Sequence, residues 1–510
     1  MFQVMTARQA ADLIRDGDCI AFNGQVRFAL AEKFISALEE RFLETGTPRN
    51  LRYLSSTCFV PMNKLAPLKG LIREMIAGHW VSFFDFAPHI LNNEIEAYNV
   101  PQGIISLNYS AAAARLPGFL TRAGLRTYTD PRFGGGALNE ISQKKFATAT
   151  EVDGKEYLFY HTIYPDVCIL RGTTCDPNGN ITAEKEMGTV DMLSMAQAAH
   201  NNGGKVIVQV ERISETYANP HEVLIPGCLV DAVYTDPDQV MLDDYQYEPL
   251  FSGETRLPEE ELPAYIDRLM ARTMQWRKPV DRFIARRAAL EVQDGDIINL
   301  GTGLPLMLAL EAHYMGKMNP SVTFTIESGV LGGVPVGFTF GASVNVGALI
   351  PQSDQFRFYE GHGLTLTAVG VLEIDKNGNV NVIRKGNKIV GVGGFSHVTA
   401  SPKRLLILTR FMVGSGMENR DGKLVITDGK APKFCDKIEY INFSADIARE
   451  EGQEVLYITE RCVFRLAESG LELIEIAPGL DLEKDILAHL SFRPAISPEL
   501  KEMPAECFDI

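Results

Sequence analysis

The sequence repeats one order of elements in its two halves, and this repeat limits the folds that the chain can adopt. Residues 10–20 and 288–298 each read as a short amphipathic helix, an Asp-Gly turn and a buried strand. The first helix also carries a start signal, because Thr6 and Gln9 have the spacing of a capping box. In both halves the strand runs into a glycine-containing turn. We therefore expect two units built on one plan.

A second repeated segment is an Asn-Gly turn between apolar strands, at 176–181 and again at 375–380, and it predicts a β-hairpin in each half. This hairpin lies about twice as far from the repeated strand in the first half, so the first half carries an insertion. An acidic, proline-containing stretch at 243–280 interrupts the rhythm of strands and helices. We expect an N-terminal domain at 1–242, a linker at 243–280 and a C-terminal domain at 281–510.

Strands rich in Val and Ile alternate with helical patterns in both halves, which is typical of parallel sheets covered by helices. The predicted fold class is α/β, with two related open-sheet domains in one chain. Open sheets of this kind bind ligands at the carboxyl ends of their strands, and sites are common at domain junctions. We expect the active site there, between the domains.

The charge balance bears on the partners of the chain. The 49 basic and 65 acidic residues give a formal net charge of -16, which argues against a nucleic acid or an anionic membrane as partner. An anionic substrate must be held locally, by backbone amides and a few cations. The N-terminal residues have no apolar leader, and no apolar stretch reaches membrane-spanning length. We expect a cytoplasmic location.

Signatures of several competing sites are missing from the sequence. The turn at 301–306 lacks the third glycine of a dinucleotide fingerprint and has proline where the helix should begin. There is no phosphate-binding P-loop and no serine-hydrolase elbow. The nine histidines include no pair at ligand spacing, and the eight cysteines form no Cys-x-x-Cys pair, which favours reduced thiols. We expect no metal.

Glu327 directly follows residues 321–326, whose β-branched and aromatic side chains predict a buried strand. Three glycines follow, Gly329, Gly332 and Gly333, and they allow backbone to approach a ligand closely. From position alone, this carboxylate is more simply a helix cap or a solvent-facing group. Its chemistry allows another role, because a carboxylate is ionised near neutral pH and attacks a thioester carbonyl without a base.

Residues 391–395, Gly-Val-Gly-Gly-Phe, offer consecutive amides that could stabilise the oxyanion formed in such an attack. A tight turn between strands explains the same residues without any ligand. The residues themselves leave both interpretations open.

The ordered motifs of the whole chain resemble the class I coenzyme A transferases, in particular the single-chain members that act on acetate, propionate and other short-chain acyl groups. The resemblance rests on residues 97–103, 129–139, 171–180, 299–305, 325–333, 340–345 and 378–382. It implies a pair of α/β domains that correspond to the α and β subunits of other members. Large enzymes of this kind are commonly homo-oligomers.

The resemblance also implies the chemistry and the site. The substrates are an acyl-CoA and a carboxylic acid, the coenzyme A thioester is both substrate and covalent intermediate, and no other cofactor is used. Glu327 matches the family's nucleophile, which forms a mixed anhydride and then a glutamyl-CoA thioester in a ping-pong exchange. Gln102 is a candidate for orienting the acyl group, or else an ordinary turn amide. Five further positions match segments that line the CoA and oxyanion region, namely Gly301, Gly303, Asn381, Gly393 and Gly394.

The chain departs from the family pattern at 24–27, at 31–32, where Ala-Glu replaces the usual Pro-Glu pair, and at His362. The usual Gly-Phe-Val-Gly loop reads Gly-Gln-Val-Arg at 24–27, so Gln25 and Arg27 could reshape the acyl pocket or supply a charge for a polar or dicarboxylic acyl group, or Arg27 could face solvent. His362 stands where glycine is usual. Two alternatives to CoA transfer use the same scaffold, namely acyl-CoA hydrolysis and non-catalytic binding of CoA.

Overall fold

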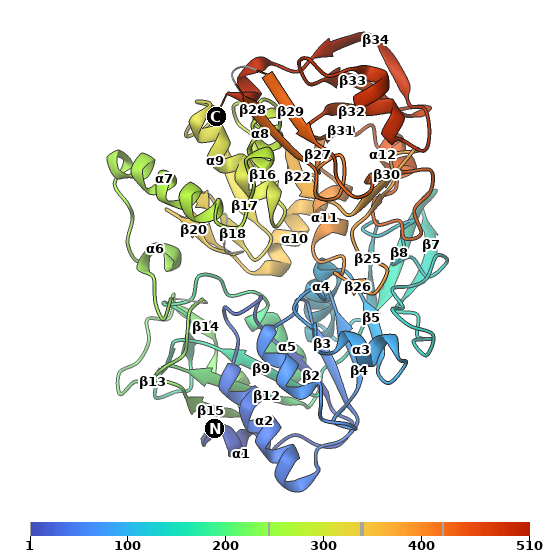
Figure 1. The fold of residues 1–510 in the computed structure, drawn as a ribbon. Helices are drawn as coiled ribbons and strands as arrows, with labels where there is room; N and C mark the ends of the chain where they lie inside the picture. The colour runs from blue at the N-terminus through green and yellow to red at the C-terminus, as the bar shows by residue number, and fades with distance from the viewer. Residues whose placement is uncertain (1, 243–244, 337–340, 421–422, 510) are drawn as a thin grey trace.

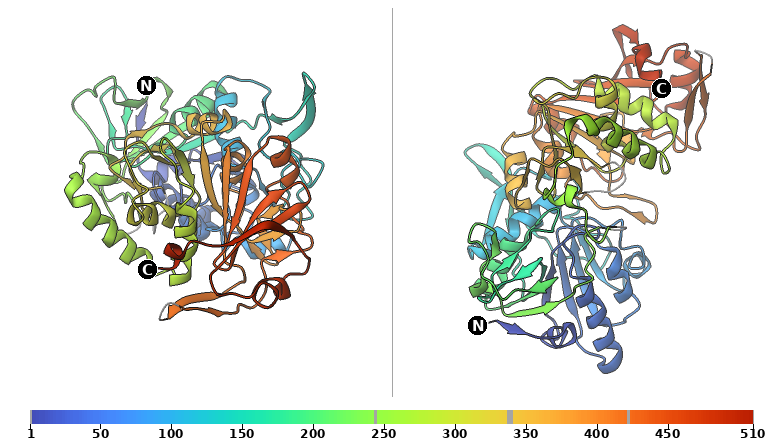
Figure 2. Two further views of the ribbon diagram at one scale, coloured as in Figure 1. Left: turned by 90° about the horizontal axis from the view of Figure 1, so that it is seen from above. Right: turned by 90° about the vertical axis from the view of Figure 1, so that its left-hand side faces the viewer.

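The computed structural model describes residues 2–242, 245–336, 341–420 and 423–509. Asp243 and Asp244 of the predicted linker, and Phe340 of one family-like segment, lie outside these residues. The chain forms two bodies, one above the other in Figure 1, with the N-terminus on the lower body and the C-terminus on the upper one. Figure 2 shows the same two bodies from above and from the side.

Eight parallel strands form the sheet of the lower body, as the apolar runs predict. In spatial order they are β1 (Gln3–Val4), β15 (Ala232–Thr235), β12 (Lys205–Val210), β9 (Val167–Arg171), β2 (Cys19–Phe22), β3 (Leu51–Ser55), β4 (Ile72–Ala77) and β5 (Glu96–Asn99). The helices include α2 (Glu32–Thr45), α4 (Gln102–Ala113) and α5 (Met192–Asn201).

The sheet of the upper body is mixed. Five parallel strands form its centre, β17 (Thr323–Ile326), β16 (Ile297–Leu300), β22 (Leu366–Gly370), β27 (Arg404–Leu408) and β31 (Glu454–Ile458). Antiparallel pairs extend both edges through β18 (Val330–Leu331), β21 (Ala348–Leu349), β32 (Cys462–Ala467) and β33 (Gly470–Ile476), and β34 (Ala495–Glu502) pairs parallel with β33. Only two or three residues connect β17 to β18, β31 to β32 and β32 to β33. These turns permit only antiparallel pairing, because a parallel crossover needs a dozen or more residues.

The repeated segments fold alike. Helix α1 (Ala7–Ala11) leads into β2, and α8 (Pro279–Ala289) leads into β16. The predicted capping box is present, because the Thr6 hydroxyl accepts from the Gln9 amide and the Gln9 side chain accepts from the Thr6 amide. Both Asn-Gly turns close antiparallel hairpins, β10 (Thr174–Cys175) with β11 (Ile181–Thr182) and β23 (Glu373–Asp375) with β24 (Val380–Asn381).

Between the two repeated segments of the first half lies a small antiparallel sheet of β6 (Gly118–Thr121), β7 (Ala147–Val152) and β8 (Lys155–His161). It lies at the right of Figure 1, beside the upper body. Arg122 and Arg126 pair with Glu451 and Glu450 at the end of α12 (Ala445–Glu450). The segment after β6 therefore contacts the second half of the chain.

The predicted linker is partly helical. It contains α6 (Pro249–Ser252) and α7 (Leu262–Thr273), whose residues Ile266, Leu269 and Met270 are buried. Figure 1 shows this segment running along one side from the lower to the upper body. The boundaries at 242 and 281 stay predictions. No helix in the described part of the chain combines the length and apolar character needed to cross a bilayer.

Candidate active site

Glu327 follows β17 at the carboxyl edge of the upper sheet, as the sequence predicts. The turn after it depends on Gly329, which has a φ of +104°. A β-carbon at this position would lie 3.1 Å from the carbonyl carbon of Ile350 and closer to its oxygen, so only glycine fits. The Ile350 amide donates to the Gly329 carbonyl at 2.9 Å. These contacts fix the path of the chain behind the carboxylate.

Gly394 packs against the Glu327 carboxylate. A β-carbon at Gly394 would lie 2.6 Å from Cδ of Glu327 and closer still to Oε2. The predicted oxyanion loop therefore lies directly on the predicted nucleophile, although 67 positions separate them in the sequence.

Hydrogen bonds tie this loop to the lower body at the carboxyl ends of β4 and β5. The Gly393 amide donates to the Gly78 carbonyl at 2.7 Å, and the Gly393 carbonyl accepts from the Gln102 amide at 2.9 Å. The Val392 amide donates to Oδ1 of Asn99 at 2.8 Å. Glu327 and the loop from the upper body thus meet strand ends of both sheets, at the junction where the sequence places the site.

The amides of the loop are not equally available. The amides of Gly391, Val392, Gly393 and Phe395 donate to protein acceptors, whereas the Gly394 amide donates to none of the described residues. Within the described residues, Gly394 therefore has the one backbone amide of this loop that is available to an oxyanion. The other amides serve the turn and the contact between the halves.

Burial raises the pKa of Glu327 from 4.5 to about 7. No donor among the described residues reaches its carboxylate to offset this effect. Tyr359 lies nearby, and its pKa is raised by burial and further by the Glu327 charge. The Tyr359 hydroxyl donates to Thr325 at 2.8 Å and accepts from Gln355 at 2.6 Å. The tyrosine is thus held in place behind the end of β17.

Cys58 and His79 form a pair that the sequence does not suggest. The Cys58 sulfur lies 3.3 Å from Nδ1 of His79. Burial raises the pKa of Cys58 to about 11 and lowers the pKa of His79 to about 4. Both groups are therefore neutral at pH 7, so the thiol lacks the thiolate character of a nucleophile. His79 instead packs beside Gly393, where Cδ2 would lie 3.3 Å from a β-carbon.

Gln102 and Gln25 both lie near this junction. Gln102 is buried at the start of α4, and its Oε1 would lie 3.8 Å from a β-carbon at Gly393. Gln25 is also buried, and its Oε1 has no partner among the described residues. The Gln25 turn presents Phe28, whose ring packs beside Gly188 near the Ser328 carbonyl. This turn therefore reaches the residue next to Glu327.

The remaining predicted positions have other contacts. Gly301 follows β16 and donates to the Ala368 carbonyl at 2.8 Å, and a β-carbon at Gly303 would lie 2.8 Å from the Arg277 guanidinium. The Asn381 side-chain amide donates to Glu373 within its own hairpin and to the carbonyl of Arg384 just after it. Their roles toward CoA stay predictions, and none of these contacts involves the Glu327 carboxylate.

His362 and Arg27, two of the departures from the family pattern, lie in loops. His362 has a φ of +62°, a left-handed conformation in which glycine is favoured, and its Nδ1 lies 3.0 Å from the Ser401 carbonyl oxygen. It is a loop residue at the end of α10 (Gln352–Glu360). Arg27 is half-buried rather than fully exposed.

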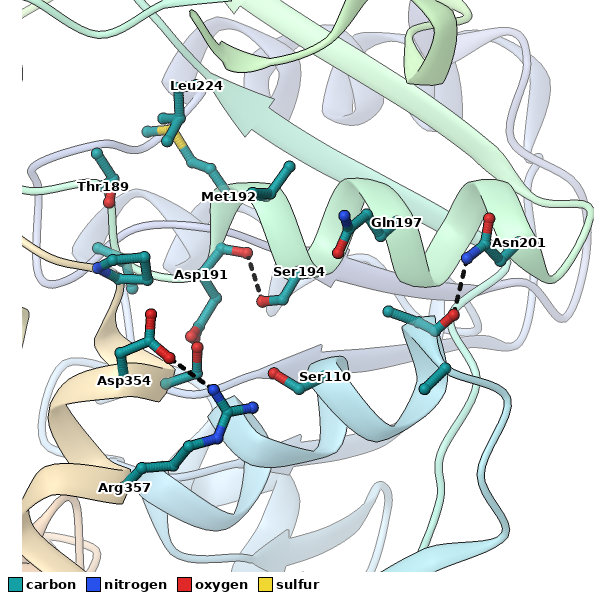
Figure 3. Close-up of a pocket in the computed structure, with 16 residues that line it drawn as sticks. Ser110, Thr189, Asp191, Met192, Ser194, Gln197, Asn201, Leu224, Asp354 and Arg357 are labelled. Atoms are coloured by element: carbon teal, nitrogen blue, oxygen red, sulfur yellow. Dashed lines mark hydrogen bonds and ion pairs between the residues drawn. The ribbon is translucent and has the colours of Figure 1, made fainter. Parts of the chain in front are cut away.

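A cavity of about 420 Å³ opens between α4, α5 and α10. Figure 3 shows Ser110, Asp191 and Ser194 on its lower-body side and Asp354 and Arg357 on α10. Glu327 does not line it. Within the described residues, no group of three or more His, Cys, Asp or Glu side chains could hold a metal ion.

Comparison with known proteins decides the family. Residues 4–236 match the family model described as coenzyme A transferase. The chain is 39% identical to acetate CoA-transferase YdiF of Escherichia coli strain K12, with 99% of this chain and 95% of the relative covered. It is 37% identical to caffeate CoA-transferase of Acetobacterium woodii, with 100% and 98% covered. The chain belongs to the coenzyme A transferase family.

Solved structures agree on the fold of this coenzyme A transferase. The crystal structure of the acyl-CoA transferase YdiF apoenzyme from Escherichia coli O157:H7 has a TM-score of 0.92 and 37% identity, and covers 99% of this chain and 96% of that one. A thioester complex of that enzyme with CoA has a TM-score of 0.91. The predicted family, enzyme class and α/β fold are confirmed.

Proposed function

We propose that this coenzyme A transferase moves CoA from a short-chain acyl-CoA to a carboxylic acid through a thioester on Glu327. The observation that carries the proposal is the packing of the Gly394 backbone, with its uncommitted amide, against the Glu327 carboxylate at the junction of the two sheets. This arrangement offers a nucleophile and an oxyanion donor in one place.

In the first half-reaction, a Glu327 oxygen attacks the thioester carbonyl, the carbon–sulfur bond breaks, and CoA leaves as a thiolate. The thiolate then attacks the glutamyl carbonyl of the mixed anhydride, which releases the acyl group as a carboxylate and leaves glutamyl-CoA. A second carboxylate reverses these steps. The Gly394 amide stabilises the oxyanion formed at each attack.

The substrates are proposed from the relatives and from Gln102 and Gln25. One relative is named for acetate and another for caffeate, so similar chains accept different acids. We propose acetate as one acid of this enzyme, with Gln102 donating to the acyl oxygen. Gln25 would accept from a polar acyl group, since its buried Oε1 has no partner among the described residues. A homo-oligomer in the cytoplasm remains part of the proposal.

Initial-rate kinetics test the two-step exchange. Varying an acyl-CoA at several fixed concentrations of acid is expected to give parallel double-reciprocal lines, because the first product leaves before the second acid binds. Intersecting lines would contradict a covalent intermediate. Release of free CoA without dependence on added acid would indicate hydrolysis instead.

The first half-reaction should depend on pH through Glu327. Only the ionised carboxylate attacks, so the rate should rise as pH increases through about 7 and level off above it. Single-turnover release of acetate from acetyl-CoA, followed from about pH 5 to 9, measures this step. A rate that is flat across this range would mean that Glu327 keeps an ordinary pKa or does not attack.

The same pKa has a consequence for stability. Folding raises the pKa of Glu327 from 4.5 to about 7. The free energy of unfolding is therefore highest, as far as this group is concerned, below pH 4.5, and it falls as pH rises through 7. Glu327→Gln should therefore raise the unfolding temperature more at pH 8 than at pH 5. Thermal unfolding by circular dichroism checks this, and an equal shift at both pH values would contradict it.

A further inference from the structure

Asp191 is a buried carboxylate outside the reacting groups, and its side chain does not cap the helix that it precedes. It precedes α5 as the N-cap residue, where aspartate normally accepts a backbone amide of the first turn. Its side chain makes no such bond. Among the described residues it also has no ion-pair partner, although a buried charge is costly without one. Arg357 on the far side of the cavity pairs with Asp354.

The Asp191 carboxylate instead accepts three side-chain donors. Ser106 donates to Oδ1, and Ser56 donates to Oδ2 at 3.0 Å. Gln352, at the start of α10, donates to Oδ2 at 2.9 Å. Two donors come from the lower body and one from the upper body, so the carboxylate lies where the two halves meet.

Gln352 connects this carboxylate to Gln102. Its Nε2 donates to Asp191, and its Oε1 accepts from Nε2 of Gln102 at 2.9 Å. Gln352 is fully buried and Gln102 is 1% exposed. The backbone amide of Gln352 also donates to the Val190 carbonyl at 2.9 Å, which holds the start of α10 on the lower body.

The charge of the Asp191 carboxylate determines the direction of the two hydrogen bonds that connect it, through Gln352, to Gln102. Burial raises the pKa of Asp191 to about 6, so the group is mainly ionised at pH 7. An ionised Asp191 can only accept, so Gln352 turns its amino group toward it and its carbonyl oxygen toward Gln102. Gln102 must then turn its amino group toward Gln352. This leaves Oε1 and one N–H of Gln102 for the site. Without the charge, both glutamines could flip, because the two ends of an amide have nearly the same shape.

The oriented group lies next to the nucleophile. The Gln102 amide donates to the Gly393 carbonyl, and Oε1 of Gln102 would lie 3.8 Å from a β-carbon at Gly393. Gly393 adjoins Gly394, which packs on Glu327. A flip of the Gln102 side-chain amide would exchange its oxygen and its amino group, and would therefore change which of them faces the acyl group.

We propose that Asp191 and Gln352 are positioning residues that hold the Gln102 amide in one orientation beside Glu327. The proposal rests on the role proposed above for Gln102 in binding the acyl group. It assigns the buried carboxylate a part in substrate orientation, exerted through two amides.

A double-mutant cycle tests this. Asp191→Asn keeps the size of the side chain and removes the charge, and it should lower kcat by about 10- to 100-fold with little change in KM for acyl-CoA. Gln102→Met should lower kcat at least as much. In the Gln102→Met background, Asp191→Asn should have less than about a twofold effect, because both changes act through one amide.

Three results would overturn the proposal. They are a wild-type rate in Asp191→Asn, a wild-type rate in Gln102→Met, or a full effect of Asp191→Asn in the Gln102→Met background. Asp354→Asn, an exposed acid on the same cavity, is the matched control and should stay within about twofold of the parent. If Asp191→Asn lowers the unfolding temperature, Ser106→Ala in the same cycle gives a milder test, with the same coupling expected.

These outcomes are separate from the thioester proposal. The cycle uses rates of CoA transfer, whereas the thioester is detected on Glu327 itself. A modified Glu327 with additive mutational effects would refute only the positioning role. Coupled effects with an unmodified Glu327 would refute only the covalent mechanism.

Discussion

Glu327→Gln is expected to lower the rate of CoA transfer by about 10⁴-fold or more. The neutral amide has the shape of the carboxylate but is a far weaker nucleophile, so neither the anhydride nor the thioester should form. Binding of CoA should persist, because the substitution leaves the junction of the two sheets in place. Steady-state transfer from acetyl-CoA to a second acid measures the loss, and calorimetry measures CoA binding.

Glu418→Gln provides the matched control for this substitution. Glu418 lies on the exposed hairpin of β28 (Gly416–Arg420) and β29 (Lys423–Thr427), and pairs with Arg420 at the surface. Its substitution should leave the rate within about twofold of the parent. If Glu327→Gln retained more than about 1% of the parental rate, another group would have to carry the acyl or CoA moiety.

Gly394→Ala is expected to lower the rate by about 10²- to 10³-fold with little effect on unfolding temperature. The added methyl group would overlap the Glu327 carboxylate, which is the free end of a flexible side chain. The carboxylate can therefore turn aside without disturbing the fold. It would then lie out of line with the thioester carbonyl and with the Gly394 amide.

Gly416→Ala is a suitable comparison, because a β-carbon there would make only an ordinary contact, 3.7 Å from Cβ of Thr427. It should leave transfer unchanged. A Gly394→Ala enzyme with near-parental activity would show that the space between this backbone and Glu327 is not used in the reaction. A large fall in unfolding temperature would show that the methyl group displaces backbone rather than the carboxylate.

Local patterns predicted the repeated elements well. The Asp-x-Asn-Gly-Asn hairpins at 176–181 and 375–380 fold alike, because the Asp176 and Asp375 side chains accept the equivalent backbone amides of their own turns. The β-branched run before Glu327 forms a buried strand for the same local reason. Such features depend on neighbours in the sequence, so they can be read from it.

The contacts that define the site depend on residues far apart in the sequence. Which amide of residues 391–395 remains free is decided by acceptors on the lower body, including Asn99 and Gly78. The pairing of Cys58 with His79 likewise arises only in the fold. The path from Asp191 through Gln352 to Gln102 joins three helices, and no spacing in the sequence signals it.

The most direct test of the covalent mechanism is the chemical state of Glu327 during turnover. The enzyme is incubated with an acyl-CoA in the absence of acceptor acid, treated with borohydride to reduce any thioester to an alcohol, digested and analysed by mass spectrometry. We predict that the peptide containing Glu327 carries the reduced side chain, and that the modification is lost when an acid is added before borohydride. An unmodified Glu327 peptide from an enzyme that still transfers CoA would contradict the mechanism.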